Sequence, residues 1–420
     1  MSDKQIFASL EISDHEIRLV IGEFFNTRFN IIKVERVSVN AFTPDGAINT
    51  DAVVSGIRTA VEDAEKMIGA SLEKVILAIP SRNMKRYSVK VTVPIRGIDG
   101  EITAGDIIQA QNNAQTLNID KNLALIQTQC IKYWVNGISS RRIPIGEKAS
   151  ELTIDIDLLC ADRDTAYELV GCVENSGLQV MDIFLDIFAI GDEAALFEQS
   201  MDRNIVILKV ERTGTTLGLI SKGRLIQCIE IPTGVGSFAE AVVDQYALQR
   251  EYAVELIKYS ARLNEKGTLS NPVHLWQDGE ETRKITEREL CDCIRPRVDE
   301  WVDEMEKLCS GILQAGRTTV IITGEGGEMQ GLSDLLKRKL DCEVRSYIPE
   351  TLGGRNAGLS TCLGLFYAYK DKLPISGYAD SSLDLEAFLN AVSYRSKDKK
   401  EVNQEDTLTK KIKGIFNGKR

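Results

Sequence analysis

The chain has 420 residues, 43% of them hydrophobic and 27% charged, and its net charge is −11. This composition predicts a soluble globular protein of two or more domains, and the acidic balance argues against nucleic-acid binding. The chain has only two histidines, His15 and His274, which argues against a zinc site and against histidine-dependent catalysis. It contains no run of about 18 apolar residues, so we expect no membrane-spanning helix.

The first 80 residues open with three apolar runs separated by short polar turns, a pattern that predicts an antiparallel meander. A helix with apolar residues on one face follows, and Pro80 ends the block. The expected elements are strands over 6–12, 17–24 and 29–39, a helix over 50–68 and a strand over 75–79.

Residues 81–155 alternate strand and helix patterns and predict a small α+β insertion. Thr103 is a candidate N-cap for its helix. The expected elements here are strands over 87–94, 123–135 and 151–159 and a helix over 104–116. A helix over 163–175, a strand over 180–185 and a helix over 189–199 then complete the first half.

A near copy of the first meander spans 204–231, about 200 residues after the first one, and predicts two similar halves. The first turn of each meander would face the cleft between the halves, where backbone N–H groups could hold phosphates. Ser237 is a candidate N-cap for the next helix. Downstream we expect helices over 238–246, 249–263, 287–315, 332–340 and 359–369, a hairpin over 273–285, and strands over 319–323 and 344–347.

The two meanders and a glycine-rich turn after residue 323 resemble, in that order, the two phosphate turns and the adenosine turn of actin, heat-shock chaperone ATPases and sugar kinases. Within this superfamily the chain resembles the FtsA family of bacterial cell-division actin homologues over about residues 5–370. Further segments that carry the likeness are Asp45–Ile48, Val75–Ser81, Gly177–Val180, Asp186–Ile190, Val254–Lys258 and Ile294–Glu300.

The resemblance implies an α/β, two-lobed actin-like fold, made of duplicated ribonuclease-H-like halves, with the inserted subdomain called 1C in this family. The implied domains are the lobe 1 core (1–80 and 156–202), the insertion 1C (81–155), the lobe 2 core (203–231 and 310–370), subdomain 2B (232–309), a disordered linker (371–406) and an amphipathic helix (407–420).

The resemblance also implies a nucleotide site. Its residues would be Thr215, Thr216, Gly234, Glu255, Lys258, Gly324, Gly326 and Gly327. Glu255 and Lys258 lie three residues apart on one helical face, where related proteins contact the ribose, although this spacing also suits a plain surface ion pair.

Both phosphate turns depart from the family pattern. The first usually reads Asp-Ile-Gly-Thr and is here residues 11–14, Glu-Ile-Ser-Asp; the second usually begins Asp-Ile-Gly-Gly and here begins with Lys209. Side chains in place of glycine block the approach of phosphate, and lysine cannot bind a cation. We therefore expect no catalytic residue, no metal ligand and no useful ATP hydrolysis, while ATP binding stays open and Mg²⁺ doubtful.

Arg297 and Glu300 match family positions that receive the C-terminal peptide of the tubulin-like protein FtsZ. The plain alternative is a solvated acidic helix. The family further implies self-assembly into filaments, and a position on the cytoplasmic face of the cell membrane at the division site.

The last fourteen residues are basic and amphipathic. Leu408, Ile412, Ile415 and Phe416 share one helical face, and the basic residues include Lys410, Lys411 and Lys413. Such a segment behind a polar linker predicts a helix that lies on anionic lipid. The alternative is a tail that docks on the chain's own body or on a partner.

The expected function is a scaffold that tethers FtsZ to the membrane. One rival is a PilM-like adaptor of a pilus or secretion machine, which needs no amphipathic tail. The other is a small-molecule kinase of the same fold, which needs a catalytic aspartate and an intact Mg²⁺ site.

Overall fold

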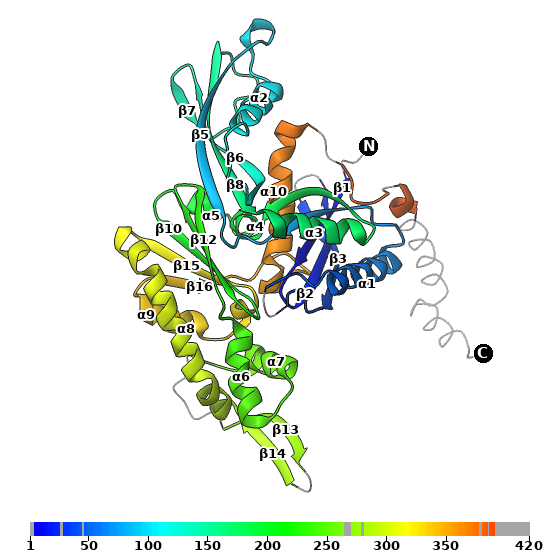
Figure 1. Cartoon of the computed structure of the whole chain (residues 1–420), viewed down its shortest axis with the longest axis vertical. Helices are drawn as coiled ribbons and strands as arrows, with labels where there is room; N and C mark the ends of the chain where they lie inside the picture. The colour runs from blue at the N-terminus through cyan, green and yellow to red at the C-terminus, as the bar shows by residue number, and fades with distance from the viewer. Residues whose placement is uncertain are drawn as a thin grey trace, which may run out of the picture.

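The computed structural model describes residues 4–25, 28–43, 46–263, 270–278, 281–377, 380–384 and 386–390. Two five-stranded sheets form the centres of two lobes (Figure 1). In lobe 1 the strand order is β3 (Arg28–Ser38), β2 (Glu16–Phe25), β1 (Lys4–Ile12), β4 (Lys74–Ile79) and β9 (Gln179–Leu185). In lobe 2 it is β12 (Arg224–Ile231), β11 (Thr215–Ser221), β10 (Asn204–Val210), β15 (Thr318–Thr323) and β16 (Glu343–Ser346).

The two sheets have the same topology. In each, an antiparallel meander is extended by two parallel strands on the side of its first strand. The predicted duplication is therefore confirmed. Because β1 and β10 are central strands with parallel neighbours, the turns that follow them lie at corresponding edges of the two sheets.

Helices α1 (Thr50–Ile68), α3 (Arg163–Asn175), α4 (Asp186–Glu193) and α10 (Ser360–Ser376) surround lobe 1. α4 also contacts the sheet of lobe 2, because a Cβ on Gly218 of β11 would lie 2.3 Å from Cγ2 of Ile187. One buried cluster accordingly includes Ile187 together with Ile205 and Ile207 of β10. The lobes thus share a continuous core.

Subdomain 2B consists of α6 (Val235–Tyr246), α7 (Arg250–Ser260), the hairpin β13 (Pro272–Asp278) and β14 (Glu281–Thr286), and much of α8 (Glu287–Ala315). α8 begins where predicted because Thr286 and Glu289 form a capping box. Ser237 is not the N-cap of α6: the helix starts earlier, with Gly234 as the N-cap. α9 (Leu332–Leu340) packs against α8.

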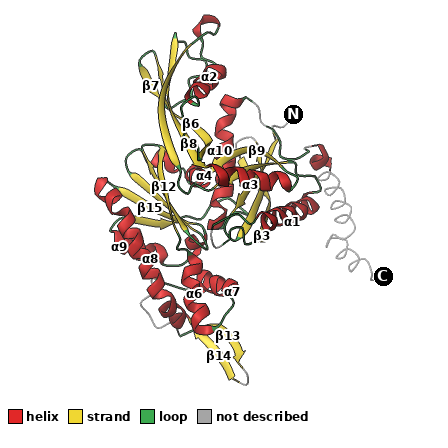
Figure 2. Ribbon diagram, viewed as in Figure 1, coloured by secondary structure: helices red, strands yellow, loops and turns green. Residues whose placement is uncertain are grey.

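The insertion has its own core and a four-stranded antiparallel sheet in the order β5 (Lys85–Pro94), β8 (Glu151–Asp162), β6 (Leu123–Val135) and β7 (Ile138–Ser140). Helix α2 (Ala104–Ala114) packs on this sheet (Figure 2). The insertion and the β13–β14 hairpin lie at opposite ends of the molecule (Figure 1). Arg224 of β12 forms ion pairs with Asp155 and Asp157, which fastens the insertion to lobe 2.

Two predicted boundaries need correction. The helix expected over 189–199 is two helices, α4 and α5 (Leu196–Gln199), because Ala195 adopts a left-handed conformation with φ 49°. Residues 371–376, expected in the linker, instead belong to α10, which continues to Ser376, and Ser382 binds lobe 1 by accepting hydrogen bonds from the backbone N–H groups of Glu73 (2.9 Å) and Ala8 (2.8 Å).

The predicted amphipathic segment over 407–420, and residues 391–406 before it, lie outside the described residues. None of the helices in the described part of the chain combines the length and apolar character that crossing a bilayer requires.

Candidate functional site

A cluster of charged side chains, the seam, lies where the turns after β1, β10 and β15 meet. Its ion pairs are organised around Arg18, Lys209 and Glu325. The turns touch directly: the Asp14 carboxylate accepts hydrogen bonds from the backbone N–H of Thr213 (2.5 Å) and from its hydroxyl (2.6 Å). Asp14 belongs to lobe 1 and Thr213 to lobe 2. The two predicted phosphate turns therefore bind each other.

Arg18 of β2 is fully buried in this seam. Its guanidinium donates two hydrogen bonds to the Glu211 carboxylate of lobe 2, at 3.0 and 2.7 Å. It also donates to Glu11 (3.0 Å) and Glu16 (2.5 Å) of lobe 1. A bidentate guanidinium–carboxylate pair in a water-free setting is among the stronger polar contacts in proteins, so Arg18 joins the lobes.

Lys209 of β10 has only 7% of its surface exposed. Its ammonium donates to Oε1 of Glu11 (2.6 Å) and to Oδ2 of Asp186 (2.8 Å), both in lobe 1. Burial opposes the charged form, but Asp186 and Glu11 outweigh it and raise the pKa of Lys209 above its usual value. The ammonium is therefore charged at every physiological pH.

Asp186 is held in place from its other side. Its Oδ1 accepts hydrogen bonds from the backbone N–H (2.8 Å) and hydroxyl (2.5 Å) of Ser81, and from the backbone N–H of Ile187 (2.7 Å). Because Asp186 starts α4, this carboxylate also lies at a helix N-terminus, which favours negative charge.

Glu325, in the 3₁₀ turn after β15, binds a second group of cations in the seam. It accepts hydrogen bonds from Arg212 (2.9 and 3.2 Å) and Lys258 (3.2 Å), and Nε2 of His15 lies 3.3 Å from it. Burial raises the pKa of Glu325, but His15, Arg212 and Lys258 together bring it well below its usual value.

His15 bridges Glu325 and Asp14, whose Oδ1 lies 2.6 Å from Nδ1 of the imidazole. Burial alone would lower the pKa of His15, but Asp14 and Glu325 raise it to about 9. The imidazole is therefore a cation at neutral pH.

The charges of the seam are paired. Six carboxylates (Glu11, Asp14, Glu16, Asp186, Glu211, Glu325) meet six cations (His15, Arg18, Arg36, Lys209, Arg212, Lys258), and Lys258 also pairs with the half-exposed Glu255. Buried ionic groups without partners are costly, and here each cation already has at least one carboxylate. A triphosphate would add several negative charges to a set that has no cation to spare.

The residues present do not fit a nucleotide bound through Mg²⁺. Asp14, His15 and Glu211 form a group close enough to hold a metal ion, but Thr213, Glu325 and Arg18 already bind these side chains. Carboxylates free to bind Mg²⁺ would be needed there.

Comparison with known proteins finds similar sequences and similar folds. No family model matches the chain. It is 22% identical to FtsA of Bacillus subtilis over 374 residues, which cover 87% of this chain and 83% of the relative. It is 25% identical to FtsA of Neisseria meningitidis over 386 residues, which cover 88% and 91%.

The chain is similar to FtsA proteins over most of its length. Solved structures agree on an actin-like fold. The PilM component of a PilM–PilN type IV pilus biogenesis complex aligns with a TM-score of 0.56 and 15% identity over 86% of this chain and 97% of that one. MreB5 of Spiroplasma citri bound to ADP aligns with a TM-score of 0.51 and 12% identity, over 89% and 99%. The predicted resemblance and fold class are confirmed.

The structure brings only part of the FtsA-derived nucleotide set to the seam. Lys258 donates to Glu255 (3.1 Å) as the spacing predicts, but it also binds Glu325. Thr215 is buried, and its hydroxyl donates to the Thr233 carbonyl (2.6 Å) and accepts from the Trp301 indole (3.1 Å). Thr216 is half-buried on β11, opposite Lys209.

The four glycines of that set lie against protein atoms. A Cβ on Gly234 would be 2.2 Å from the Glu211 carbonyl oxygen, and one on Gly324 would be 2.7 Å from the Val210 carbonyl oxygen. A Cβ on Gly326 would meet Val210 at 2.6 Å, and one on Gly327 would meet Ala357 at 2.8 Å. These glycines let the turns pack closely on one another.

Sequence reasoning missed Arg18, Glu16, Asp186 and Glu325 as seam residues. One signal was present: Arg18 interrupts an apolar strand, and charged residues are rarely fully buried without partners. Of the predicted partner residues, Arg297 and Glu300 are exposed on α8, and the lipid-binding residues from Leu408 to Phe416 lie outside the described part.

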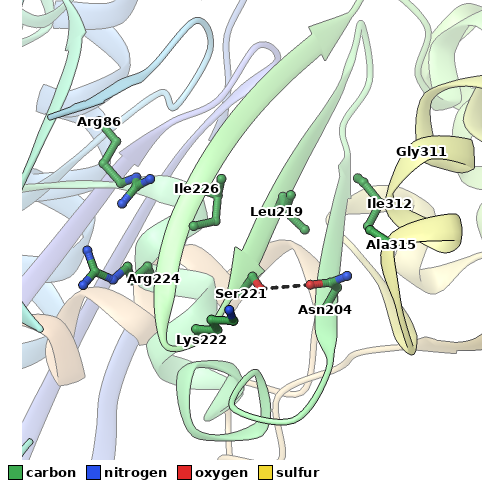
Figure 3. A pocket seen from close by; sticks show the side chains of 10 residues that line it. All are labelled: Arg86, Asn204, Leu219, Ser221, Lys222, Arg224, Ile226, Gly311, Ile312 and Ala315. Carbon is green, nitrogen blue, oxygen red and sulfur yellow. Dashed lines mark hydrogen bonds between the residues drawn. The ribbon is translucent and has the colours of Figure 1, made fainter. Parts of the chain in front are cut away.

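A separate hollow of about 550 Å³ opens on lobe 2, away from the seam. Leu219 and Ile226 lie on neighbouring strands of its floor, with Ile312 of α8 opposite (Figure 3). Arg86 and Arg224 line it but already pair with Asp157. None of the predicted site residues lines this hollow.

Proposed function

We propose that the chain is a cell-division scaffold that polymerises on the cytoplasmic membrane and tethers FtsZ filaments, with weak or no ATP hydrolysis. The observation that carries the proposal is the relationship to FtsA, which covers most of this chain and most of each relative. A likeness confined to one lobe would support only a shared fold.

The proposed FtsZ-binding surface is the exposed face of α8 around Arg297 and Glu300. Two features support it: both residues are exposed, and both match the family positions. Arg297 can bind a carboxylate of an acidic peptide, and Glu300 can accept from a basic or hydroxyl group.

Co-sedimentation with FtsZ on anionic liposomes tests the proposal. We expect FtsZ to pellet only when this chain is present, and Arg297→Glu to abolish that recruitment. Lys307→Glu is the matched control, because it makes the same charge change at another exposed position of α8. FtsZ that stays in the supernatant with the wild-type chain would contradict the proposal.

The membrane part of the proposal rests on the basic amphipathic pattern of 407–420. Deleting these residues should abolish liposome binding and leave FtsZ binding in solution unchanged. Lipid binding that survives the deletion would favour the rival function, a cytoplasmic adaptor like PilM. The structure that aligns with this chain comes from the PilM–PilN complex.

The seam, in which every cation is already paired with a carboxylate, supports a scaffold that works without nucleotide. We expect no heat of binding when Mg²⁺–ATP is titrated to millimolar concentration by calorimetry. Binding of one nucleotide per chain that depends on Mg²⁺ would overturn this part of the proposal and reopen the kinase alternative.

A further inference from the structure

We propose that Lys209 is a covalently attached cation that does, permanently, what a bound metal ion would do in this cleft: it neutralises facing carboxylates and joins the lobes. Lys209 comes from β10 of lobe 2, whereas Glu11 and Asp186 come from β1 and α4 of lobe 1. Its ammonium reaches both, at 2.6 and 2.8 Å.

The two carboxylates are oriented for a cation before Lys209 is considered. The second oxygen of Glu11 is held by Arg18 at 3.0 Å, and the second oxygen of Asp186 is held by Ser81 and the Ile187 N–H. Each carboxylate is therefore left with one oxygen, and both of these oxygens point to the lysine ammonium.

Removing the ammonium would leave two buried, fixed carboxylate oxygens that face a common point. Oxygen ligands of this kind suit hard divalent cations, and the cost of unpaired buried charge favours any cation that enters. The native chain needs no bound cation between these carboxylates, because the lysine ammonium is part of the chain and cannot dissociate.

The test is thermal unfolding of Lys209→Met, which keeps the length and apolar stem of the side chain and removes the charge. Each protein is heated in EDTA, in Mg²⁺ and in Ca²⁺ at matched ionic strength. We expect the wild-type Tm to be the same in all three. The variant should melt several degrees lower in EDTA and regain part of that loss in Mg²⁺ or Ca²⁺.

Lys222→Met is the control, because Lys222 lies on the turn after β11, away from the seam, and the change should leave the Tm unaltered in every buffer. A Lys209→Met Tm equal to that of the wild type would overturn the proposal. So would a lower Tm that divalent cations do not raise.

A second variant keeps the proposal testable if Lys209→Met does not fold. Glu11→Gln combined with Lys209→Met removes one negative charge together with the positive one. We expect this double variant to be more stable than Lys209→Met alone and to respond less to divalent cations. If both variants are insoluble, restoring the net charge does not restore the fold, and the proposal would be wrong.

Discussion

His15 should make the folded protein less stable as the pH becomes alkaline. Its folded pKa of about 9 is above the ordinary value of 6.5, so its ionic contribution is fully present below about pH 6.5 and is lost as pH rises through about 9. The contribution is at most about 3 kcal/mol. Urea unfolding between pH 6.5 and 10 should show that the wild type exceeds His15→Gln in free energy of unfolding at the lower pH and that this difference shrinks as the pH rises.

His274→Gln is the control for this measurement, because His274 contacts Tyr252 and no carboxylate of the seam. Its stability relative to the wild type should not change over the same pH range. If the difference in free energy of unfolding between the wild type and His15→Gln stays constant over this pH range, the imidazole is not charged in the folded protein.

Arg18 should be the most costly single side chain of the seam to remove. Arg18→Met leaves Glu11, Glu16 and Glu211 buried with one counter-charge fewer, and breaking a buried ionic network costs about 3–5 kcal/mol. Arg36→Met is the matched control, because Arg36 is partly exposed and, among the described residues, forms its ion pair with Glu16. Equal losses of unfolding free energy in the two variants would contradict the assignment of Arg18 as the link between lobes.

The sequence revealed only part of the seam. Lys209 stands out because it replaces an expected aspartate, so the loss of a metal site could be predicted. The pairing of Arg18 with Glu211 could not, because these residues are 193 positions apart and their contact depends on how the lobes meet.

At the scale of elements, boundaries set by local contacts were predicted well. α8 and α3 begin where expected because Thr286 and Asp162 cap them with their own side chains. The break between α4 and α5 was not predicted, because alanine at position 195 gives no signal for a left-handed turn. Gly234 replaced Ser237 as a cap because the turn packs on the Glu211 carbonyl, a tertiary contact.

The crossing of α4 and α10 depends on Gly364. A Cβ there would lie 1.9 Å from the Ala189 carbonyl oxygen, so Gly364→Ala should force the helices apart and cost about 1–3 kcal/mol. Gly171→Ala in α3 is the control, because a Cβ at that position would meet no atom within 4 Å beyond the backbone of its own helix in the described part of the chain. That change should stabilise the protein by up to about 1 kcal/mol. Thermal unfolding of both variants separates packing from helix propensity, and a stabilised Gly364→Ala would contradict the described crossing.

At the scale of the whole molecule, residues 380–384 and 386–390 belong to the folded body. Leu383 and Phe388 are buried against lobe 1, and Leu383 pairs with Leu72 through an isolated β-bridge. A chain that ends at residue 390 should keep the wild-type Tm, whereas one that ends at residue 377 should lose about 3 kcal/mol or more, because two large apolar side chains are removed from the core. Equal Tm values for the two truncations would contradict this docking.

The two-lobed architecture could be predicted because the sequence contains two meanders with the same pattern of apolar runs and turns. The way the lobes are joined could not, because it arises from charges on segments that approach only after folding. The duplicated topology therefore indicates the fold, whereas the altered seam bears on what the cleft can bind.

The attached ammonium of Lys209 has a consequence for assembly. A filament whose protomers hydrolyse a bound nucleotide has an earlier and a later form, and the change between them sets its lifetime. In the filament proposed for this chain, a protomer closed by its own side chains would have a single form, so the filament would not change with time in this way. Their growth and loss would then follow protomer concentration, membrane area and partner supply.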